Sequence, residues 1–468
     1  MEDILHSSIS QLTDLFRTGK VSPVELIEAT FSAINQSDAQ LNAFIALFEE
    51  AALEEAKQAE KEIRGSRSLG PLHGIPIALK DIIHVAETTT TCGSKFYATG
   101  SSQFDAAVAA RLKAAGAIII GKTNLHEFAF GVTTENPHFG ATANPWDLRC
   151  IPGGSSGGSG AAVVAGFCAG AIGTDTGGSI RVPSALCGNV GLKPTYGRVS
   201  VQGIVELAQS LDCVGPMCRY VEDVAIMMNA LAGYDREDVH AENRMVPNYA
   251  DNLGRPISGL KAGIPKQHFF DNLDADVNRL VADAIKTLEE LGLELIELDV
   301  PFVADAHEAA LTILMAEASY FHKRWFMAHR EDYGRDLRDI LEVGQELSAS
   351  DYIRAVRKRE IAQRNFVEVF TQLDLILCPT VPIPAPHRSM LGQSAESESN
   401  KIRPRLTQNT RVFNLLGLPA LSVPCGLTKQ GVPVGLQISG QWWSEKNLLQ
   451  IAHAYEQTRP PAWPGLDG

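Results

Sequence analysis

Two serines that lie 24 residues apart, each in a glycine-rich segment, constrain this chain more than any other feature. Ser155 lies in Gly-Gly-Ser-Ser-Gly-Gly-Ser at 153–159, and Ser179 lies in Gly-Thr-Asp-Thr-Gly-Gly-Ser-Ile-Arg at 173–181. Glycine lacks a Cβ and reaches positive φ at little steric cost, so such segments let the backbone approach a ligand closely. Both segments therefore predict sites where backbone N–H groups bind an anion or an oxyanion.

The composition of residues 153–159 is also typical of a flexible linker. However, residues 161–167 (Ala-Ala-Val-Val-Ala-Gly-Phe) follow directly and are apolar and compatible with a helix, which favours a buried element. The phosphate-binding pattern G-x-x-x-x-G-K-[ST] needs a lysine after its last glycine, and this segment has none. We therefore expect neither a linker nor a phosphate loop here.

The first segment also matches the nucleophile elbow G-x-S-x-G, in which a serine stands between a strand and a helix. Residues 148–152 (Leu-Arg-Cys-Ile-Pro) are a poor buried strand because they carry a charge and a proline. A Ser-His-Asp enzyme further needs a histidine, and the candidates His387 and His453 fall in an expected polar loop and on an expected helix. The elbow remains an alternative at this point.

A lysine upstream is the other candidate base for a serine nucleophile. Residues 75–79 (Ile-Pro-Ile-Ala-Leu) form an apolar, strand-like run that ends at Lys80. A lysine at an exposed strand end keeps a pKa near ~10.4 and is almost entirely charged at pH 7, so it would be an inefficient base. Burial disfavours the charged amine and lowers its pKa. An exposed lysine and a buried neutral base are both compatible with the sequence.

Longer stretches of the chain resemble the amidase signature family. The likeness spans nearly the whole chain and rests on Pro-Leu-His-Gly-Ile-Pro at 71–76, Lys80-Asp81, both serine segments, Cys-Gly-Asn-Val-Gly-Leu-Lys-Pro-Thr at 187–195, Leu-Cys-Pro-Thr at 377–380 and Leu-Gly-Leu-Pro-Ala-Leu-Ser-Val-Pro at 416–424. The resemblance implies an α/β fold with a central mixed β-sheet covered by α-helices on both sides. It also implies an amidase, which cleaves the C–N bond of a carboxylic amide to an acid and ammonia or an amine, with no cofactor.

The same resemblance implies a Ser-cisSer-Lys triad. Ser179 would be the nucleophile that becomes acylated, Ser155 would follow a cis peptide bond and relay the proton, and Lys80 would be the base. A serine hydroxyl is a weak nucleophile until a neighbouring base withdraws its proton. Backbone N–H groups would form the oxyanion hole, namely those of Thr176, Gly177, Gly178 and Ser179.

By the same likeness, residues 128–131 would form part of the wall of the substrate pocket. The expected pocket residues are Ala129, Phe130 and Gly131. Their apolar character favours a substrate with a small to medium hydrophobic acyl group. Asp175 and Arg181 flank the nucleophile, and we expect them to form a structural ion pair rather than to bind substrate, because special loops need a rigid support.

Two branches of the family must be separated. One is the A subunit of a tRNA-dependent amidotransferase, which hydrolyses glutamine within an assembly, and the other consists of free-standing amidases. Members of the amidotransferase branch usually carry glutamine after Ser-Ile-Arg and Met-Asp before Glu-Phe-Ala, whereas this chain has Val182 and Leu125-His126. These departures favour a free-standing amidase. The glutamine-hydrolysing branch and a urea- or carbamate-type hydrolase remain alternatives, and an inactive scaffold is disfavoured by the intact triad positions.

The composition argues against several other classes of protein. The net charge of −14 argues against nucleic acid as a partner, and the eight cysteines form no CxxC pair, which predicts reduced core residues and no metal site. The N-terminus lacks the basic and apolar regions of a secretory signal, and the longest weakly apolar run, 161–173, is too short to span a bilayer. We therefore expect a cytoplasmic enzyme with a small-molecule amide substrate, no membrane partner and, if it is an oligomer, a homodimer.

We expect a single amidase domain over residues 1–468. It would comprise an N-terminal helical segment over about 1–65, the signature core over about 70–220, and a helical region over about 300–405 that sets substrate specificity. Ser22-Pro23-Val24-Glu25 is a capping box with proline at the first helical position, which predicts the start of a helix.

Two further patterns are typical of a layered α/β sheet, in which a helix leads into a strand. One pairs a helix over 105–115 with a strand over 117–120, and the other pairs a helix over 275–291 with a strand over 293–298. Residues 304–370 favour helix. The polar stretch 387–405 is rich in serine and glutamate and predicts a mobile loop.

Overall fold

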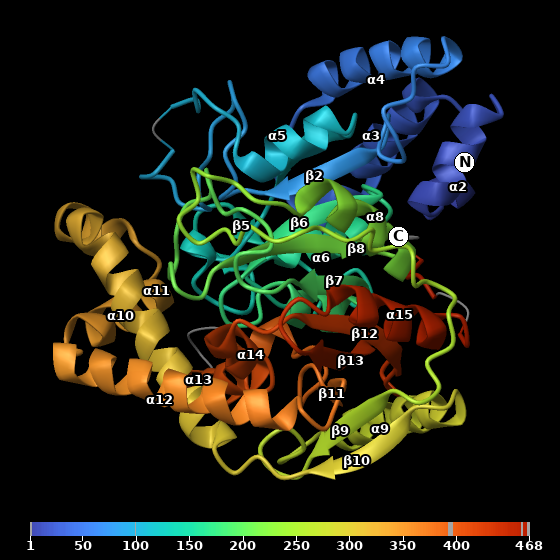
Figure 1. Cartoon of the computed structure of the whole chain (residues 1–468). Helices are drawn as coiled ribbons and strands as arrows, with labels where there is room; N and C mark the ends of the chain where they lie inside the picture. The colour runs from blue at the N-terminus through green and yellow to red at the C-terminus, as the bar shows by residue number, and fades with distance from the viewer. Residues whose placement is uncertain (1, 99, 392–395, 460–461, 466–468) are drawn as a thin grey trace.

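One mixed sheet runs through the whole molecule, with helices packed on both of its faces (Figure 1). The structure is a computed structural model that describes residues 2–98, 100–391, 396–459 and 462–465. Its eleven strands lie in the order β1 (Phe44–Leu47), β3 (Ile118–Thr123), β2 (Pro76–Lys80), β6 (Gly170–Asp175), β8 (Cys213–Cys218), β7 (Val190–Lys193), β12 (Ala420–Leu427), β13 (Pro433–Gly440), β11 (Leu375–Pro379), β9 (Lys261–Pro265) and β10 (Glu294–Leu298). The predicted fold class is confirmed.

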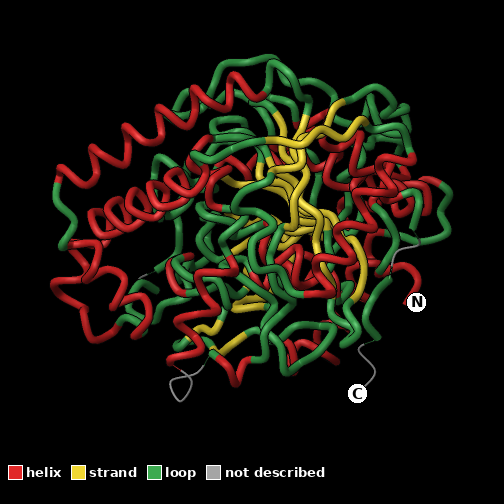
Figure 2. Tube along the Cα trace, turned by 90° about the horizontal axis from the view of Figure 1, so that it is seen from below, coloured by secondary structure: helices red, strands yellow, loops and turns green. Residues whose placement is uncertain are grey.

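The helices divide between the two faces and a lateral extension. Their bounds are α1 (Glu2–Leu5), α2 (Ile9–Arg17), α3 (Pro23–Leu41), α4 (Glu49–Arg64), α5 (Ala107–Ala114), α6 (Gly157–Val164), α7 (Arg181–Cys187), α8 (Val221–Leu231), α9 (Ala275–Glu290), α10 (Val303–His329), α11 (Arg335–Gln345), α12 (Ala349–Val369), α13 (Glu396–Leu406), α14 (Arg411–Leu416) and α15 (Glu445–Glu456). Figure 2 shows the strands crossing the middle of the molecule, with helices and loops around them.

Successive residues of a strand point to opposite faces of the sheet, and β2 shows this division clearly. Ile77 and Leu79 pack in the large apolar cluster that contains residues of α5, α8, α9 and α15. Ala78, between them, packs in a second cluster with residues of α3, α4 and α6. Because both faces are covered, the whole of β2 is buried, including its last residue, Lys80.

Neighbouring parallel strands place the two key segments at one edge of the sheet. β2 pairs in parallel with β6, with Ile77 opposite Gly170 and Leu79 opposite Ile172. The carboxyl ends of β2 and β6 therefore meet, and polar groups that follow such strands gather at that edge. β8 and β7 then continue the sheet in antiparallel pairing.

Most of the predicted elements are present. The capping box at the start of α3 is confirmed, because Ser22 Oγ accepts from Glu25 N–H at 3.1 Å and the Glu25 carboxylate accepts from Ser22 N–H at 2.8 Å. The pairs α5 and β3, and α9 and β10, lie within a few residues of the expected bounds. The region 304–370 is mainly helical, as expected, and α10, α11 and α12 extend beyond the sheet at the left of Figure 1.

The expected loop over 387–405 is wrong for most of its length. Residues 388–390 form a 3-10 turn, and α13 (Glu396–Leu406) covers most of the rest, while residues 392–395 lie outside the described part of the chain. Tertiary contacts account for the difference, because Arg403 of α13 donates to Asp336 of α11 at 2.7 Å and Leu406 is fully buried. Within the described residues, no helix is both long and apolar enough to cross a bilayer.

Candidate active site

Lys80 is a buried lysine between two hydroxyl groups. Its Nζ lies 2.7 Å from Ser155 Oγ and 2.8 Å from Thr174 Oγ1, and its side chain is fully shielded from solvent. Burial lowers the pKa of Lys80 to about 7, although the charges of Asp175 and Asp212 act in the opposite direction. The exposed-lysine alternative is therefore wrong, and an appreciable fraction of this amine is neutral near pH 7.

Ser155 follows a cis peptide bond, Gly154–Ser155, in a segment that is tightly packed. Thr134 holds this segment from one side, since its Oγ1 donates to Gly153 O at 2.8 Å and accepts from Gly157 N–H at 3.1 Å. A Cβ on Gly157 would lie 2.3 Å from the same hydroxyl oxygen, so only glycine fits at the start of α6.

The nucleophile elbow lacks the strand that it requires. Residues 148–152 are described and contain only a single bridge, between Cys150 and His387, instead of a strand that leads to the serine. His453 lies on α15, where its Nδ1 accepts from Gly254 N–H. This geometry favours Lys80 over a histidine as the partner of the serines.

The segment that carries Ser179 joins β6 to α7 and is shaped by the carboxylate of Asp175. That carboxylate accepts from the N–H groups of Gly178 at 2.8 Å and Ile180 at 3.1 Å. Gly178 has a φ of 134°, and a Cβ there would lie 2.3 Å from Thr410 Oγ1. Glycine is therefore required at this position for both its backbone angle and the lack of space.

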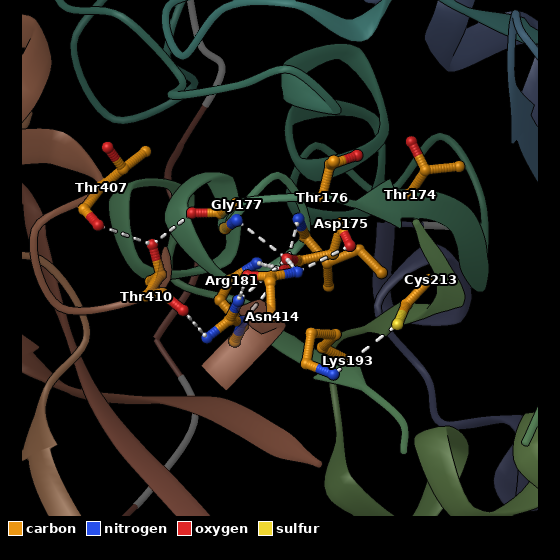
Figure 3. A network of polar contacts seen from close by, with 12 residues as sticks. Thr174, Asp175, Thr176, Gly177, Arg181, Lys193, Cys213, Thr407, Thr410 and Asn414 are labelled. Carbon is orange, nitrogen blue, oxygen red and sulfur yellow. Dashed lines mark hydrogen bonds and ion pairs between the residues drawn. The ribbon is translucent and has the colours of Figure 1, made fainter. Parts of the chain in front are cut away.

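Arg181 ties this turn to distant parts of the chain, and Figure 3 shows the network. It forms the expected buried ion pair with Asp175, at 2.9 Å. The remaining guanidinium N–H groups reach Thr410 O, Asn414 Oδ1 and Gln437 Oε1. Burial alone would raise the pKa of Asp175, but the Arg181 guanidinium and Asn414 hold it well below its ordinary value. The pair is thus a rigid support for the Ser179 turn.

A cavity of about 280 Å³ opens in front of Ser179. The three expected pocket residues, Ala129, Phe130 and Gly131, line it together with Thr176 and Gly177 of the expected oxyanion hole. The remaining lining residues were not indicated by the sequence motifs: Val132, Leu207, Leu311, Leu314, Met315, Ile340, Arg403, Pro404, Thr407 and Arg411. Phe128 instead packs behind this wall, against the rings of Phe96, Tyr97 and His322. Ala129 has a φ of 59°, an uncommon angle for a residue with a side chain.

The residues at the positions that separate the two branches of the family are buried and do not line this cavity. His126 Nε2 contacts Asp336 Oδ2 at 2.9 Å, and its ring fills the space that a side chain at Gly131 would need, with a Cβ only 2.2 Å away. Val182 is fully buried in α7. Neither residue lines the cavity, and His126 supports its wall at Gly131.

Several residues of the site could not be selected from the sequence. Thr174 contacts Lys80 because β2 and β6 are neighbours in parallel register, and neither the pairing nor the register is visible in the chain order. Asn414 and Arg411 reach the Ser179 turn from α14, more than 230 positions later. The only available signal was the family-like stretch 416–424, which begins at the end of that helix.

Three residues of the types that can bind a metal ion lie close together, although the sequence predicted no metal site. The ligand atoms of Asp147, Cys150 and His387 lie within 4.8 Å of one another. Both carboxylate oxygens of Asp147 already accept from Arg149, at 2.9 and 2.7 Å. The cluster is therefore a surface ion pair beside a cysteine and a histidine, outside the cavity at Ser179.

Known proteins match both the sequence and the fold over nearly the whole chain. The family model described as Amidase matches residues 25–449. The chain belongs to the amidase signature family. It is 39% identical to the A subunit of the glutamyl-tRNA(Gln) amidotransferase of Carboxydothermus hydrogenoformans, over 97% of this chain and 98% of that protein.

Solved structures of the family superpose over almost the entire chain. The native peptide amidase of Stenotrophomonas maltophilia is 30% identical, with a TM-score of 0.84 and coverage of 99% of each chain. A chain from a vestigial protein complex that reveals the evolutionary origins of an s-triazine catabolic enzyme is 31% identical, with a TM-score of 0.92 and coverage of 98% of this chain and 100% of that one. The similarity to amidotransferase A subunits favours that branch, whereas the residues at 125–126 and 182 predict a free-standing amidase.

Proposed function

We propose that this amidase-signature enzyme hydrolyses a carboxylic amide through an acyl-enzyme on Ser179. The observation that carries the proposal is the contact between Lys80 Nζ and Ser155 Oγ, 2.7 Å, in a buried setting next to the cavity that contains Ser179. Burial of the amine keeps part of it neutral near pH 7, as a general base requires.

The proton path in this proposal runs from Ser179 through Ser155 to Lys80. Ser179 Oγ bonds to the carbonyl carbon while its proton passes to Ser155 Oγ, and the proton of Ser155 passes to Lys80 Nζ. When the tetrahedral intermediate collapses, the C–N bond breaks and the amine leaves with a proton returned along the same path. Water then attacks the carbonyl carbon of the ester on Ser179, and the same groups take up its proton. The bond between that carbon and Ser179 Oγ breaks, the carboxylic acid leaves, and Ser179 Oγ regains a proton along the same path.

The amides of the turn after β6 are the proposed oxyanion hole, with donors fixed where negative charge develops. The Gly178 N–H group donates to Asp175 Oδ1 at 2.8 Å, so it would have to leave that carboxylate to serve. We therefore assign the oxyanion to Thr176, Gly177 and Ser179, with Gly178 shaping the turn. Thr176 is itself held by its hydroxyl, which donates to Asp212 Oδ1.

A second candidate is the glutamine-hydrolysing A subunit of a tRNA-dependent amidotransferase. The identity of 39% over 97% of the chain favours it, and its chemistry at Ser179 would be the same. The difference lies in the substrate and in the need for partner subunits. Ureas and carbamates are further substrates of the same chemistry. For either candidate we infer a reducing, cytoplasmic location, because all eight cysteines are buried free thiols.

The deciding experiment uses the purified chain alone, with aryl and alkyl amides, glutamine, ureas and carbamates as substrates and Ser179→Ala as the control. Release of amine from simple amides that depends on Ser179 would establish a free-standing hydrolase. Activity on glutamine only, or activity that requires added partner subunits, would establish the amidotransferase function.

A fluorophosphonate probe tests the assignment of the nucleophile independently of substrate. Mass spectrometry should find the adduct on Ser179 in the wild-type chain and no adduct in Ser179→Ala. An adduct on Ser155 or Ser156 would restore the nucleophile elbow. No adduct at all, together with no hydrolysis, would favour an inactive scaffold.

A further inference from the structure

Arg411 is a cation without a carboxylate partner in the cavity that contains Ser179. It is the first residue of α14 and lines the cavity together with Gly177 and Ser179. Across the described residues, no aspartate or glutamate oxygen lies within 4.0 Å of its guanidinium, and its side-chain hydrogen bond is with His307 Nε2, at 3.2 Å. A charge in such a place is costly unless it is paired.

His307 does not supply the missing negative charge. Burial, with the nearby charge of Arg411, lowers the pKa of His307 to about 3, so its imidazole is neutral. The Gln408 backbone acts on this pKa in the opposite direction, and the His307 ring packs against His268, whose Nε2 contacts Gln408 O. Burial also lowers the pKa of Arg411 to about 10, which still leaves the guanidinium charged at pH 7.

The other arginine of the cavity differs in this respect. Arg403 donates to Asp336 Oδ2 at 2.7 Å and lies 4.0 Å from Glu135, so its charge is compensated by the protein. Most of the remaining wall is apolar, with Leu311, Leu314 and other aliphatic side chains. Arg411 is therefore the strongest uncompensated polar feature that faces Ser179 in the described structure.

We propose that Arg411 binds a carboxylate of the substrate, so that the natural substrate is the monoamide of a short dicarboxylic acid. This rests on the proposed function, because the amide carbon must reach Ser179 Oγ. A guanidinium binds a carboxylate through two parallel N–H···O bonds. A Cβ built on Gly177 would lie 3.8 Å from Arg411 Nε, so the guanidinium is close to the assigned oxyanion amides. A carboxylate bound to Arg411 would therefore be separated from the scissile carbonyl by only a few carbon atoms.

The test compares succinamate and glutaramate with the neutral amides butyramide and valeramide, as the ratio of kcat/KM values. We expect the wild-type chain to prefer the carboxylates about 100-fold, as loss of one partner from a desolvated charge pair costs this much or more. Arg411→Leu should reduce the ratio to near one, and Arg411→Lys should retain part of it. Arg403→Leu is the matched control, and its ratio should stay near that of the wild type.

Three results would overturn the proposal: no preference in the wild type, an unchanged ratio in Arg411→Leu, or loss of the ratio in Arg403→Leu alone. If Arg411→Leu does not fold, the kcat/KM ratios of the wild type and of Arg411→Lys still test whether Arg411 binds the carboxylate. Calorimetry of the wild-type chain with succinate and with neutral butyramide tests the preference for a carboxylate even without turnover. Normal fluorophosphonate labelling of Ser179 without a carboxylate preference would reject this inference alone, whereas no labelling and no hydrolysis would reject the proposed function.

Discussion

Lys80 shows how burial shifts an ordinary side chain toward its neutral form. Its pKa is lowered to about 7 by burial, against an unfolded value near 10.5, and its amine contacts Ser155 at 2.7 Å. Below pH 7 the amine holds its proton and cannot accept another, so activity should be low there. We expect kcat/KM for a neutral amide to rise as the pH increases through about 7 and to level off above it.

A pH series from 5 to 9 on the purified chain measures this profile. The matched variant is Lys80→Met, which keeps an unbranched side chain of similar length but removes the amine. Its kcat should fall by roughly 10³-fold or more, because the proton of the nucleophile then has no acceptor. A flat profile, or a variant within tenfold of the wild type, would show that another group is the base.

Gly178 and Gly177 form a natural pair of test sites in the Ser179 turn. Gly178 has a φ of 134° and a Cβ there would approach Thr410 Oγ1 to 2.3 Å, whereas a Cβ on Gly177 meets only Arg411 atoms at 3.7 Å or more. We expect Gly178→Ala to lower the free energy of unfolding by about 1–3 kcal/mol. Gly177→Ala should change it far less. Denaturant unfolding of both variants measures the difference, and equal effects would contradict this account of the turn.

Among the elements, the link between β6, α7 and α14 depends on Arg181. Asp175 is fully buried, and its charge is compensated by that guanidinium at 2.9 Å. Arg181→Leu would leave a buried carboxylate without its cation, and we expect the free energy of unfolding at pH 7 to fall by about 3–5 kcal/mol. Denaturant unfolding measures this loss. Arg279→Leu is the control, because Arg279 pairs with Asp276 on the exposed side of α9 and should contribute little.

The loss of stability in Arg181→Leu should depend on pH, and the pKa of Asp175 fixes the direction of that dependence. Arg181 holds the pKa of Asp175 below its ordinary value, so this pair stabilises the fold above pH ~4 and loses its effect as the pH falls further. The difference between wild type and Arg181→Leu should therefore be largest at neutral pH and shrink below pH ~4. A difference that grows in acid would contradict the role assigned to the ion pair.

Elements with a local signal could be predicted from the sequence, and those held by distant contacts could not. The capping box of α3 and the apolar face of α9, with Val277, Val281 and Leu288, involve residues only a few positions apart. In α13, by contrast, the local composition resembles a loop and Pro404 lies inside the helix. Its contact with α11 through Arg403 and Asp336 joins residues 67 positions apart, which no local pattern indicates.

At the scale of the whole molecule, sheet order decides which residues form the site. The serine segments and Lys80 were visible as motifs, but the positions of Thr174 and Arg411 follow from the strand order β2, β6, β8, β7, β12 and from the return of α14 to the Ser179 turn. Strand order depends on long-range pairing, for which a single sequence carries little signal. Lys80, Ser155 and Ser179 were therefore predictable as candidate residues, whereas the position of Arg411 in the cavity at Ser179 was not.

Residues close to the N-terminus and to the C-terminus pack together beside α8, and we expect the stability of this junction to depend on pH. His6 stacks on Trp463, with 5.9 Å between the ring centroids. Asp223 of α8 accepts from Ile9 N–H at 2.8 Å, and its second oxygen has no hydrogen-bond partner within the described chain. Burial raises the pKa of Asp223 to about 8. The folded state therefore binds a proton here that the unfolded chain releases near pH ~4.

This proton stabilises the fold most fully below pH ~4, and its contribution is lost as the pH rises to about 8, by up to about 1.4 kcal/mol per pH unit. Asp223→Asn imitates the protonated acid and should remove that loss, so the variant should gain stability relative to the wild type between pH 5 and 9. The comparison must be made at each pH, because Lys80, with its lowered pKa, contributes a slope of opposite sign above pH 7. Urea unfolding of both chains, with Glu297→Gln as an exposed control, measures it. A constant difference across this range would show that Asp223 is ionised throughout.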